Sequence, residues 1–455
     1  MLVSDSGMAL AVVMLMSVIL FLLAETAVML PTYRALESGN AARLNTSRQL
    51  AEVGINEYME QLRRSYSFYK TNPAYPTDGP RYTSDGGSWR VFESTTPSGT
   101  VKLKAISRLP NGTVRVLESY VRFPSWAKYI VLVDKGPYSI GTGATFYGDV
   151  HCNEGISNSG VITGEASTVS PYTCSWGTSK AVNYPGGIDN NVDKKDFNAV
   201  ATDLAAMKTS AQTNSSYYGA LGTGYLGYSC EINGAQATVY KITAVNKNQP
   251  RTGVTPADPL IGTLTKTLVG TVIIPAEGVL YFDDDVWVTG TYGVAVTVAS
   301  SGTIYCPANL VPANNVDNLT CGLVAEGQIL FPWWYDTMPD NQLVQAALLS
   351  RTAGVGPDAP SGLKKYNTST KGWTDTLTLT TSDYKSSVTI KGARAMVQMI
   401  GFSSGYTIRN FDKDPVLANN PPPLYPKLPG DGLMVSTWTE RAWNPGAPDY
   451  DPQWW

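Results

Sequence analysis

Met8-Ala-Leu-Ala-Val-Val-Met-Leu-Met-Ser-Val-Ile-Leu-Phe-Leu-Leu-Ala24 is an apolar run in which Ser17 is the only polar residue. At about 1.5 Å of rise per helical residue, the run has close to the minimum length that spans the hydrocarbon core of a bilayer. After Glu25 the apolar character resumes and extends to Pro31. The run therefore predicts a helix that crosses a membrane.

The segment after Pro31 keeps a helical pattern but becomes amphipathic. Between Arg34 and Arg64 the apolar residues recur mostly at three- or four-residue spacing, the period of a helix that buries one face. We therefore expect one long helix over residues 8–66, with a second half that packs against a partner element. The apolar residues of this half are Leu44, Ala51, Ile55, Tyr58, Met59 and Leu62.

This N-terminus resembles that of the type IV filament proteins, the pilins and pseudopilins. In such a protein, residues 1–7 are a leader that prepilin peptidase removes after Gly7, and Met8 becomes the methylated first residue. Pro31 lies close to the kinking proline of pilins, and Ala51-Glu-Val-Gly-Ile-Asn-Glu-Tyr58 resembles a segment of bulky minor pilins. The resemblance implies a precursor in the cytoplasmic membrane whose helix then docks among other pilin-like subunits.

Two departures from the family pattern concern the leader and the fifth mature position. The leader contains no Lys or Arg, although such leaders are normally basic and the positive-inside rule favours that charge. Val12 occupies the position at which major pilins carry Glu. Lack of that Glu is typical of a few minor subunits at a filament tip, so the resemblance favours a minor subunit.

Two other interpretations of the apolar run remain open. A cleaved secretory signal would have a basic first segment, a shorter apolar core and a small-residue cleavage site, for which Ala24-Glu-Thr-Ala27 is a poor match. A plain single-span anchor is allowed by the length alone. That interpretation makes the chain an envelope protein unrelated to filaments.

The composition is that of an exported β-rich chain without an evident metal centre. Only 16% of the 455 residues are charged, and the net charge of −3 gives no reason to expect nucleic-acid binding. No close Cys-x-x-Cys pair occurs and His151 is the only histidine, which argues against zinc. In an oxidising compartment the simplest pairings are Cys152 with Cys174 and Cys306 with Cys321, which leaves Cys230 unpaired; the sequence does not fix this connectivity.

A small antiparallel sheet is expected after the helix, over residues 67–128. Trp89–Phe92 and Val101–Ser107 alternate in polarity, and Asn111-Gly112 separates the second run from Thr113–Phe123. Asn-Gly between alternating runs is a strong hairpin signal. A long helix followed by such a meander is also the pilin plan.

The residue pattern changes after Trp126, where very short β-prone segments alternate with Gly, Asn and Ser. This spacing predicts the stacked coils of a β-solenoid over residues 129–430, with an irregular β-sandwich as the alternative. Asp196–Thr209 is expected to be a helical insertion, and residues 431–455 a C-terminal tail. The fold class is therefore α+β: a long N-terminal helix, a small antiparallel sheet and a large β-rich domain.

The last third of the chain carries a second resemblance, to the large passenger domains of bulky bacterial minor pilins. The shared order includes Arg409-Asn-Phe-Asp-Lys-Asp-Pro-Val-Leu417 and then Pro421-Pro-Pro-Leu-Tyr-Pro426. Independently of the resemblance, three successive prolines favour an extended segment that lies over a surface as a strap.

Candidate chemistry is sparse. Asp283, Asp284 and Asp285 offer carboxylates to calcium, but no calcium-binding loop pattern surrounds them and a solvated turn is the simpler interpretation. Paired carboxylates on a solenoid also suit a polysaccharide hydrolase, although sequence does not show their separation. Trp333, Trp334 and Tyr335 form either a docking patch for sugars or proteins, together with the terminal tryptophans, or part of the core.

The sequence thus predicts a minor pilin-like subunit, at or near a filament tip, that presents a β-rich domain for surface adhesion or assembly. We expect no catalytic residues and no cofactor, with calcium as a weak candidate. Expected partners are other pilin-like subunits, the membrane before assembly, and a surface glycan or protein. The competing interpretation is a surface-anchored β-solenoid hydrolase or lyase.

Overall fold

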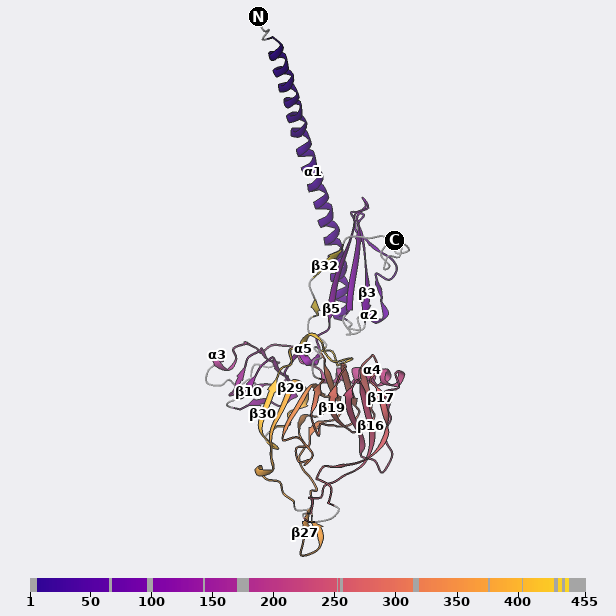
Figure 1. Cartoon of the computed structure of the whole chain (residues 1–455), viewed down its shortest axis with the longest axis vertical. Helices are drawn as coiled ribbons and strands as arrows, with labels where there is room; N and C mark the ends of the chain where they lie inside the picture. Colours follow the sequence, from indigo (N-terminus) through magenta and orange to yellow (C-terminus); the bar gives the residue numbers. More distant parts are fainter. Residues whose placement is uncertain are drawn as a thin grey trace. The chain divides into compact units, whose positions relative to one another are not determined.

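The computed structural model describes residues 6–64, 68–95, 101–141, 144–169, 180–251, 253, 257–313, 319–374, 377–402, 404–428, 433–435 and 438–441. The chain divides into two compact units (Figure 1). Unit 1 comprises Met1–Thr96, Thr100–Arg122 and Leu433–Trp455, and unit 2 comprises Pro97–Gly99 and Phe123–Gly432.

Unit 1 is built on one long helix, α1 (Ser6–Arg64), which continues through Pro31 and is followed by the short α2 (Phe68–Thr71). The amphipathic second half of α1 packs on strands β3 (Ser88–Thr95), β4 (Val101–Arg108) and β5 (Val114–Arg122), as its spacing predicts. Its inward residues are fully buried, and this confirms the predicted one-sided helix. They are Ala51, Ile55, Tyr58 and Leu62.

The sheet that receives this helix is antiparallel, as predicted. Its order is β1-β3-β4-β5, with β2 beside β3. Gly112 has φ +85° and closes the hairpin between β4 and β5, where the Asn-Gly signal falls. The strands are β1 (Ala74–Tyr75), β2 (Arg81–Tyr82), β3 (Ser88–Thr95), β4 (Val101–Arg108) and β5 (Val114–Arg122).

Two short strands among the last described residues belong to this sheet, whereas the sequence predicts a C-terminal tail at 431–455. Strands β31 (Met434–Val435) and β32 (Thr439–Arg441) both pair antiparallel with β5. Arg441 places its Nε 3.1 Å from a carboxylate oxygen of Glu118, which is 3% exposed, and Lys102 Nζ lies 3.0 Å from the other oxygen. Sequence reasoning misses this pairing because each strand is only two or three residues long.

Truncation after residue 432 should therefore weaken unit 1. It removes the strands that cover the β5 edge and one of the two cations that face the buried Glu118 carboxylate, so we expect a loss of about 2 kcal/mol in local stability. Hydrogen exchange of β5 amides in the full-length and truncated chains measures this. Unchanged exchange would show that β31 and β32 contribute nothing to the sheet.

Unit 2 is a β-solenoid of mostly parallel strands in which the chain visits three faces in turn, and this confirms the predicted large β-rich domain. Face 1 has the order β14-β18-β20-β23-β25-β29-β6-β9-β12-β13, with every pair parallel. Its strands are β14 (Tyr217–Tyr218), β18 (Val279–Phe282), β20 (Val296–Ser300), β23 (Cys321–Ala325), the second half of β25 (Asn341–Ser350), the second half of β29 (Lys385–Gln398), β6 (Val131–Lys135), β9 (Val150–Cys152), β12 (Ala166–Thr168) and β13 (Ile188–Asp189).

The other two faces follow the same stacking. Face 2 contains β15 (Gly227–Gly234), β19 (Val286–Tyr292), β21 (Ile304–Tyr305), β24 (Ile329–Phe331) and β26 (Val355–Pro357). Face 3 contains the end of β19, β22 (Leu310–Pro312), the first halves of β25 and β29, and β30 (Tyr406–Asp412). In the first coils the corresponding pairs are β7 (Tyr138–Ile140) with β10 (Ile156–Asn158), and β8 (Thr145–Phe146) with β11 (Val161–Ile162).

The coils do not stack in chain order. The first coils, from β6 to β13, lie at one end, and the chain then passes to the opposite end and builds back from β14 to β30. The two runs meet where Arg394 of β29 pairs with Val131 of β6. Phe146 and Phe411 stack with ring centroids 6.2 Å apart, which continues face 3 across the same junction.

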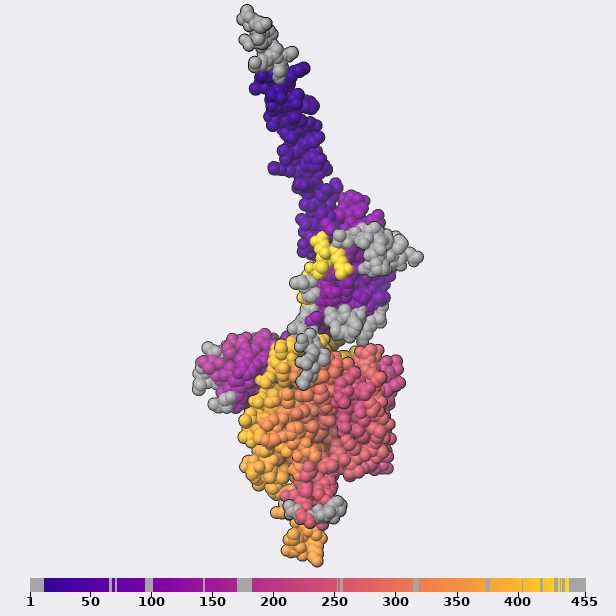
Figure 2. All heavy atoms as spheres, in the orientation of Figure 1, coloured from indigo at the N-terminus to yellow at the C-terminus, as the bar shows by residue number. Residues whose placement is uncertain are grey.

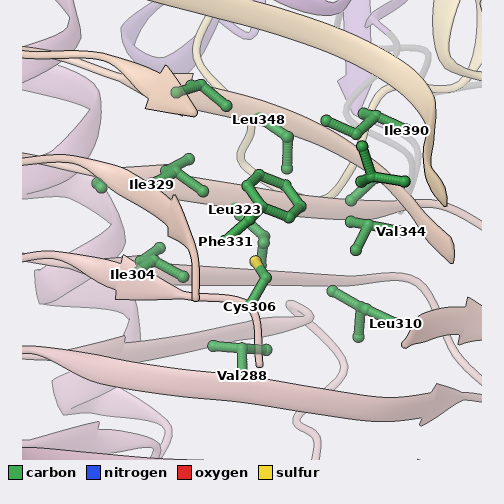
Figure 3. Close-up of a cluster of buried hydrophobic side chains, with 14 of the residues drawn as sticks. Val288, Ile304, Cys306, Leu310, Leu323, Ile329, Phe331, Val344, Leu348 and Ile390 are labelled. Carbon is green, nitrogen blue, oxygen red and sulfur yellow. The ribbon is translucent and has the colours of Figure 1, made fainter. Parts of the chain in front are cut away.

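The interior of the solenoid is apolar and closely packed. Figure 3 shows Phe331 among Cys306, Leu323, Val344 and Ile390, side chains that converge from different coils. Each coil presents a few residues to this interior and none buries them alone, so the stack as a whole supplies the burial that stabilises the fold.

The outer side of face 1 is covered by elements that the sequence partly predicts. Helix α4 (Val200–Thr213), with the turn η3 (Phe197–Ala199) before it, lies where the helical insertion is expected and buries Phe197, Val200, Leu204 and Met207. The proline segment is also the predicted strap, since Thr297 donates a 2.5 Å hydrogen bond to the carbonyl oxygen of Pro423. The turn η1 (Trp126–Lys128) and α5 (Pro415–Asn419) belong to the same cover, with Trp126 and Leu417 in its cluster.

The long insertions gather at the corner between faces 2 and 3. Residues 332–340 join β24 to β25, and residues 358–384 join β26 to β29 and contain β27 (Lys365–Asn367), β28 (Gly372–Thr374) and the turn η4 (Thr381–Asp383). The loop between the hairpin strands β16 (Gln236–Val245) and β17 (Leu264–Ile273) reaches the same place, because Asn248 bridges to Lys364. The short helix α3 (Lys180–Asn183) lies among the first coils.

Candidate assembly and binding surfaces

The first half of α1 is an apolar surface that no other described part of unit 1 covers. From Val12 to Leu36 every residue is exposed, including Phe21 at 70% and Leu20 at 66% (Figure 2). The helix is long and apolar enough to cross a membrane, as an anchor or as a signal sequence, and among the described residues it is the one such helix. The predicted membrane span is thus present as a continuous helix.

The serine and threonine hydroxyl groups between Val12 and Leu36 bond within the helix. Ser17 Oγ donates to the carbonyl of Val13 at 2.7 Å, and Thr26 and Thr32 donate to the carbonyls four residues before them, both at 2.9 Å. These bonds satisfy the hydroxyl donors without water. The surface can therefore enter lipid, or a bundle of similar helices, without leaving these hydroxyl donors unsatisfied.

The residues singled out for processing and assembly lie on this helix. Gly7 and Met8 fall in its first turns, and Val12 is 50% exposed. Pro31 lies inside the helix, where it lacks the amide proton that would bond to the preceding turn. Whether the chain is cut after Gly7, methylated at Met8 or docked through this surface remains a prediction.

The three aspartates at 283–285 are engaged in local contacts. Asp283 accepts hydrogen bonds from Lys208 Nζ at 2.7 Å and from the Tyr217 hydroxyl at 2.9 Å, and the Lys208 bond lowers the pKa of Asp283. Asp284 accepts the backbone N–H of Leu221, and Asp285 accepts that of Thr303 at 2.7 Å. The three carboxylates point to different partners, and in the described part of the chain no set of three or more such groups is placed to hold a metal ion.

Trp333, Trp334 and Tyr335 belong to the core, which is one of the two alternatives that the sequence leaves open for them. Their exposed fractions are 3%, 7% and 3%. The Trp334 indole donates to Asp358 at 2.9 Å, and the Tyr335 hydroxyl accepts the indole N–H of Trp287 at 3.1 Å. The terminal tryptophans Trp454 and Trp455 lie outside the described residues.

The expected bond between Cys306 and Cys321 is absent from the structure, while the expected pairing of Cys152 with Cys174 involves a residue that is not described. Cys306 and Cys321 are both buried free thiols, and so are Cys152 and Cys230, whereas Cys174 lies outside the described residues. Burial raises the pKa of Cys230 and of Cys306 to about 12, so both are overwhelmingly protonated near neutral pH. These cysteines pack as small apolar residues of the solenoid core.

His151 is fully buried, and both of its ring nitrogens have hydrogen-bond partners. Its Nδ1 lies 2.9 Å from the Ser167 hydroxyl and its Nε2 lies 2.9 Å from Oδ1 of Asn153. Asn153 in turn donates to Asp134 at 2.6 Å and to the backbone carbonyl of Lys195. This polar network ties the first coils to the segment that leads into α4.

Sequence reasoning misses one group of surface residues, at the projecting hairpin β27–β28. Arg251 pairs with Asp258 and lies over the rings of Tyr366 and Trp373. A signal is present in the sequence, since Lys364-Lys-Tyr366 and Lys371-Gly-Trp373 flank a polar turn. The distant Arg251 that completes the group is invisible to local patterns.

Comparisons with known proteins do not assign this chain to a family. No protein-family model matches the chain, and no curated protein matches it. Among solved structures, the crystal structure of an ice-binding protein from an Antarctic ascomycete, Antarctomyces psychrotrophicus, aligns with 65% of this chain and 98% of its own, at 8% identity and a TM-score of 0.25. At that score and identity the alignment assigns neither fold nor function to this chain.

Proposed function

We propose that this chain is a minor pilin-like subunit of a type IV filament, at or near the tip, which presents unit 2 for surface adhesion or filament assembly. The observation that carries the proposal is the two-part character of α1. Its first half is apolar and exposed while its second half is buried on an antiparallel sheet, within one unbroken helix. A plain membrane anchor does not require its span to continue as the core helix of a folded domain.

The proposal includes the route and the partners. The precursor resides in the cytoplasmic membrane through residues 12–36, and after cleavage the same surface docks among the helices of other pilin-like subunits. Val12 stands where major pilins carry Glu. The lack of that Glu favours a subunit at the filament tip, beyond which no further subunit has to be contacted. Unit 2 then faces the outside as a filament or cell-surface domain.

We also propose that unit 2 binds and does not catalyse, and that it uses neither a cofactor nor nucleic acid. The separate engagement of Asp283, Asp284 and Asp285 and the burial of His151 support this choice over a surface-anchored hydrolase or lyase. A calcium role for these aspartates would require them to leave their present partners.

Replacement of Gly7 by valine tests the proposal. If prepilin peptidase cuts after Gly7, the larger side chain should block cleavage, so the chain should remain in the membrane fraction at precursor mass. Ala24→Val is the matched control. It also enlarges a small side chain, but at the Ala24–Ala27 segment, where a secretory signal peptidase would cut. Processing that persists in Gly7→Val but fails in Ala24→Val would support the signal-peptide alternative and contradict the pilin-like one.

A further inference from the structure

The sheet of face 2 ends in a strand that has a neighbour on one side only. Strands β16 and β17 form a hairpin that extends face 2 beyond β15, since β16 pairs with β15 and β17 pairs with β16, both antiparallel. In the described part of the chain, β16 is the one strand that pairs with β17. Figure 1 shows β17 at the outer margin of unit 2. The other side of β17 is therefore an open sheet edge, and all ten of its residues are described.

Two hydrogen bonds fix which backbone groups of β17 face this open edge. At one end the Asn246 amide donates to the Thr263 carbonyl at 2.9 Å, and at the other end the Ile274 amide donates to the Ala235 carbonyl at 2.9 Å. Successive residues of an antiparallel strand alternate between bonding to the neighbouring strand and facing away from it. The alternation changes phase once, at Val269, the extra residue of a β-bulge against β16. The residues whose N–H and C=O groups face the open edge are therefore Leu264, Lys266, Leu268, Thr271 and Ile273.

The open edge lies beyond the last coil of the solenoid. Strand β14 on face 1 pairs with β18, and β15 on face 2 pairs with β19, so β14 and β15 belong to the same end coil. Face 2 then adds β16 and β17, which is about 10 Å at the usual spacing between strands. On face 1, β14 is the last described strand at this end. The edge of β17 thus projects past the strands of the end coil, where another chain can reach it.

The side chains of β17 suit an apolar partner of low charge. Leu268, Val269 and Ile273 are 60%, 46% and 70% exposed. Lys266 is the one charged residue of the strand, and its ammonium group is already paired with Glu231. Six of the ten residues are β-branched, which favours strand pairing, and the strand contains no proline. It therefore has few of the charges and prolines by which sheet edges are protected from pairing.

We infer that unit 2 binds a second copy of itself by antiparallel pairing of β17 with β17, about a two-fold axis between Leu268 and Val269. Leu268 of each copy then faces Val269 of the other, which covers exposed apolar side chains with one another. The contact is isologous, and it continues the sheet of face 2 from one solenoid into the other. This inference goes beyond the proposed function and does not depend on it.

The bulge makes the edge complementary to itself over both halves of the strand. About the proposed axis, Leu264 of each copy meets Ile273 of the other, and Lys266 meets Thr271. Every such pair joins two residues whose backbone groups face the open edge, and the four pairs can exchange about eight hydrogen bonds. An axis one position nearer to Gly270 also matches four pairs, but it opposes Lys266 to Ile273. A strand from another protein would have to reproduce this spacing, bulge included, whereas a second copy has it by symmetry.

Association of the full-length chain in detergent micelles tests this inference, measured by analytical ultracentrifugation over a dilution series. We expect a reversible dimer. Leu268→Glu and Leu268→Lys should each associate at least about tenfold more weakly, because each brings two like charges together beside the axis. An equimolar mixture of these two variants should associate within about threefold of the unmodified chain, since opposite charges then meet.

Val182→Glu is the matched control. Val182 is 63% exposed, similar to Leu268, but it lies on α3 among the first coils, so association should stay within about twofold of the unmodified chain. The apolar half of α1 is the same in every variant, and any association through it is therefore equal in all of them. Hydrogen exchange of β20 and β23 amides shows that each variant is folded.

Residue-resolved hydrogen exchange locates the contact. In the unmodified chain, the amides of Lys266, Thr271 and Ile273 should become more protected as the chain concentration rises. The amides of Thr265 and Val272 face β16 and should not respond. In Leu268→Glu the concentration dependence should disappear.

Three outcomes would overturn the inference. These are a chain that stays monomeric throughout the dilution series, an equal response to Leu268→Glu and Val182→Glu, and a mixture of the two charged variants that associates no better than either alone. The last outcome would mean that the edge of β17 is not paired with itself. Each leaves the cleavage test at Gly7 unaffected, so the dimer contact and the pilin-like assignment stand or fall separately.

Discussion

Replacing Phe331 with alanine should destabilise the solenoid of unit 2 by about 3–5 kcal/mol, the usual cost of emptying a phenylalanine site in a close-packed core. Phe331 is fully buried, and its ring centroid lies 5.5 Å from that of Phe402. Figure 3 shows it surrounded by residues of several coils, so no single loop can move to fill the space. The loss should therefore extend to the neighbouring coils.

Hydrogen exchange of the full-length chain measures this effect. Amides of β20, β23 and β25 should exchange about 10²- to 10³-fold faster in Phe331→Ala, since each 1.4 kcal/mol is a factor of ten. Tyr147, in the same unit, is 59% exposed, so Tyr147→Ala should change exchange by less than about threefold. Unit 1 in the same sample serves as an internal reference. Equal exchange in the two variants would contradict a shared solenoid core.

Leucine at Gly54 should separate the helix of unit 1 from its sheet. A β-carbon at Gly54 would lie only 2.7 Å from Cε3 of Trp89 and 3.1 Å from Val91 Cγ2, and Trp89 is 1% exposed. A larger side chain must push the helix off the sheet, and such overpacking costs about 1–3 kcal/mol or more. The gain in helix propensity over glycine, about 0.8 kcal/mol, offsets only part of that cost.

Gly39→Leu is the matched control for this prediction. It makes the same change in the same helix, but no atom lies within 4 Å of a β-carbon there. It should leave unit 1 unchanged or slightly more stable because helix propensity improves. Exchange of β3, β4 and β5 amides distinguishes the two variants. If both behave alike, Gly54 is not the contact that brings α1 close to the sheet.

Sequence analysis predicts correctly those elements that are specified by residues close together in the chain. The apolar run and the three- to four-residue period place α1 and its buried face, and the alternation around Gly112 places the β4–β5 hairpin. The short β pieces identify solenoid coils because each coil repeats a local pattern. The Ala-Glu-x-Gly segment also gains a physical reason, since Gly54 lets Trp89 approach the helix.

What the sequence does not predict depends on contacts between distant segments. The pairing of β29 with β6 and of β32 with β5 joins segments hundreds of residues apart, and no local periodicity encodes it. The aromatic run at Trp333 is ambiguous because a buried cluster and a docking patch share one composition. Loop length suggests a bond between Cys306 and Cys321, but the structure uses both as apolar core residues.

The mass of the N-terminal peptide of the mature chain tests the central claim most directly. The chain should be isolated from its native envelope, digested, and its first peptide identified by mass spectrometry. The pilin-like account predicts that the peptide begins at Met8, with the additional mass of one methyl group if the amine is methylated. A peptide that begins at Met1, or at a cut near Ala27, would contradict the account.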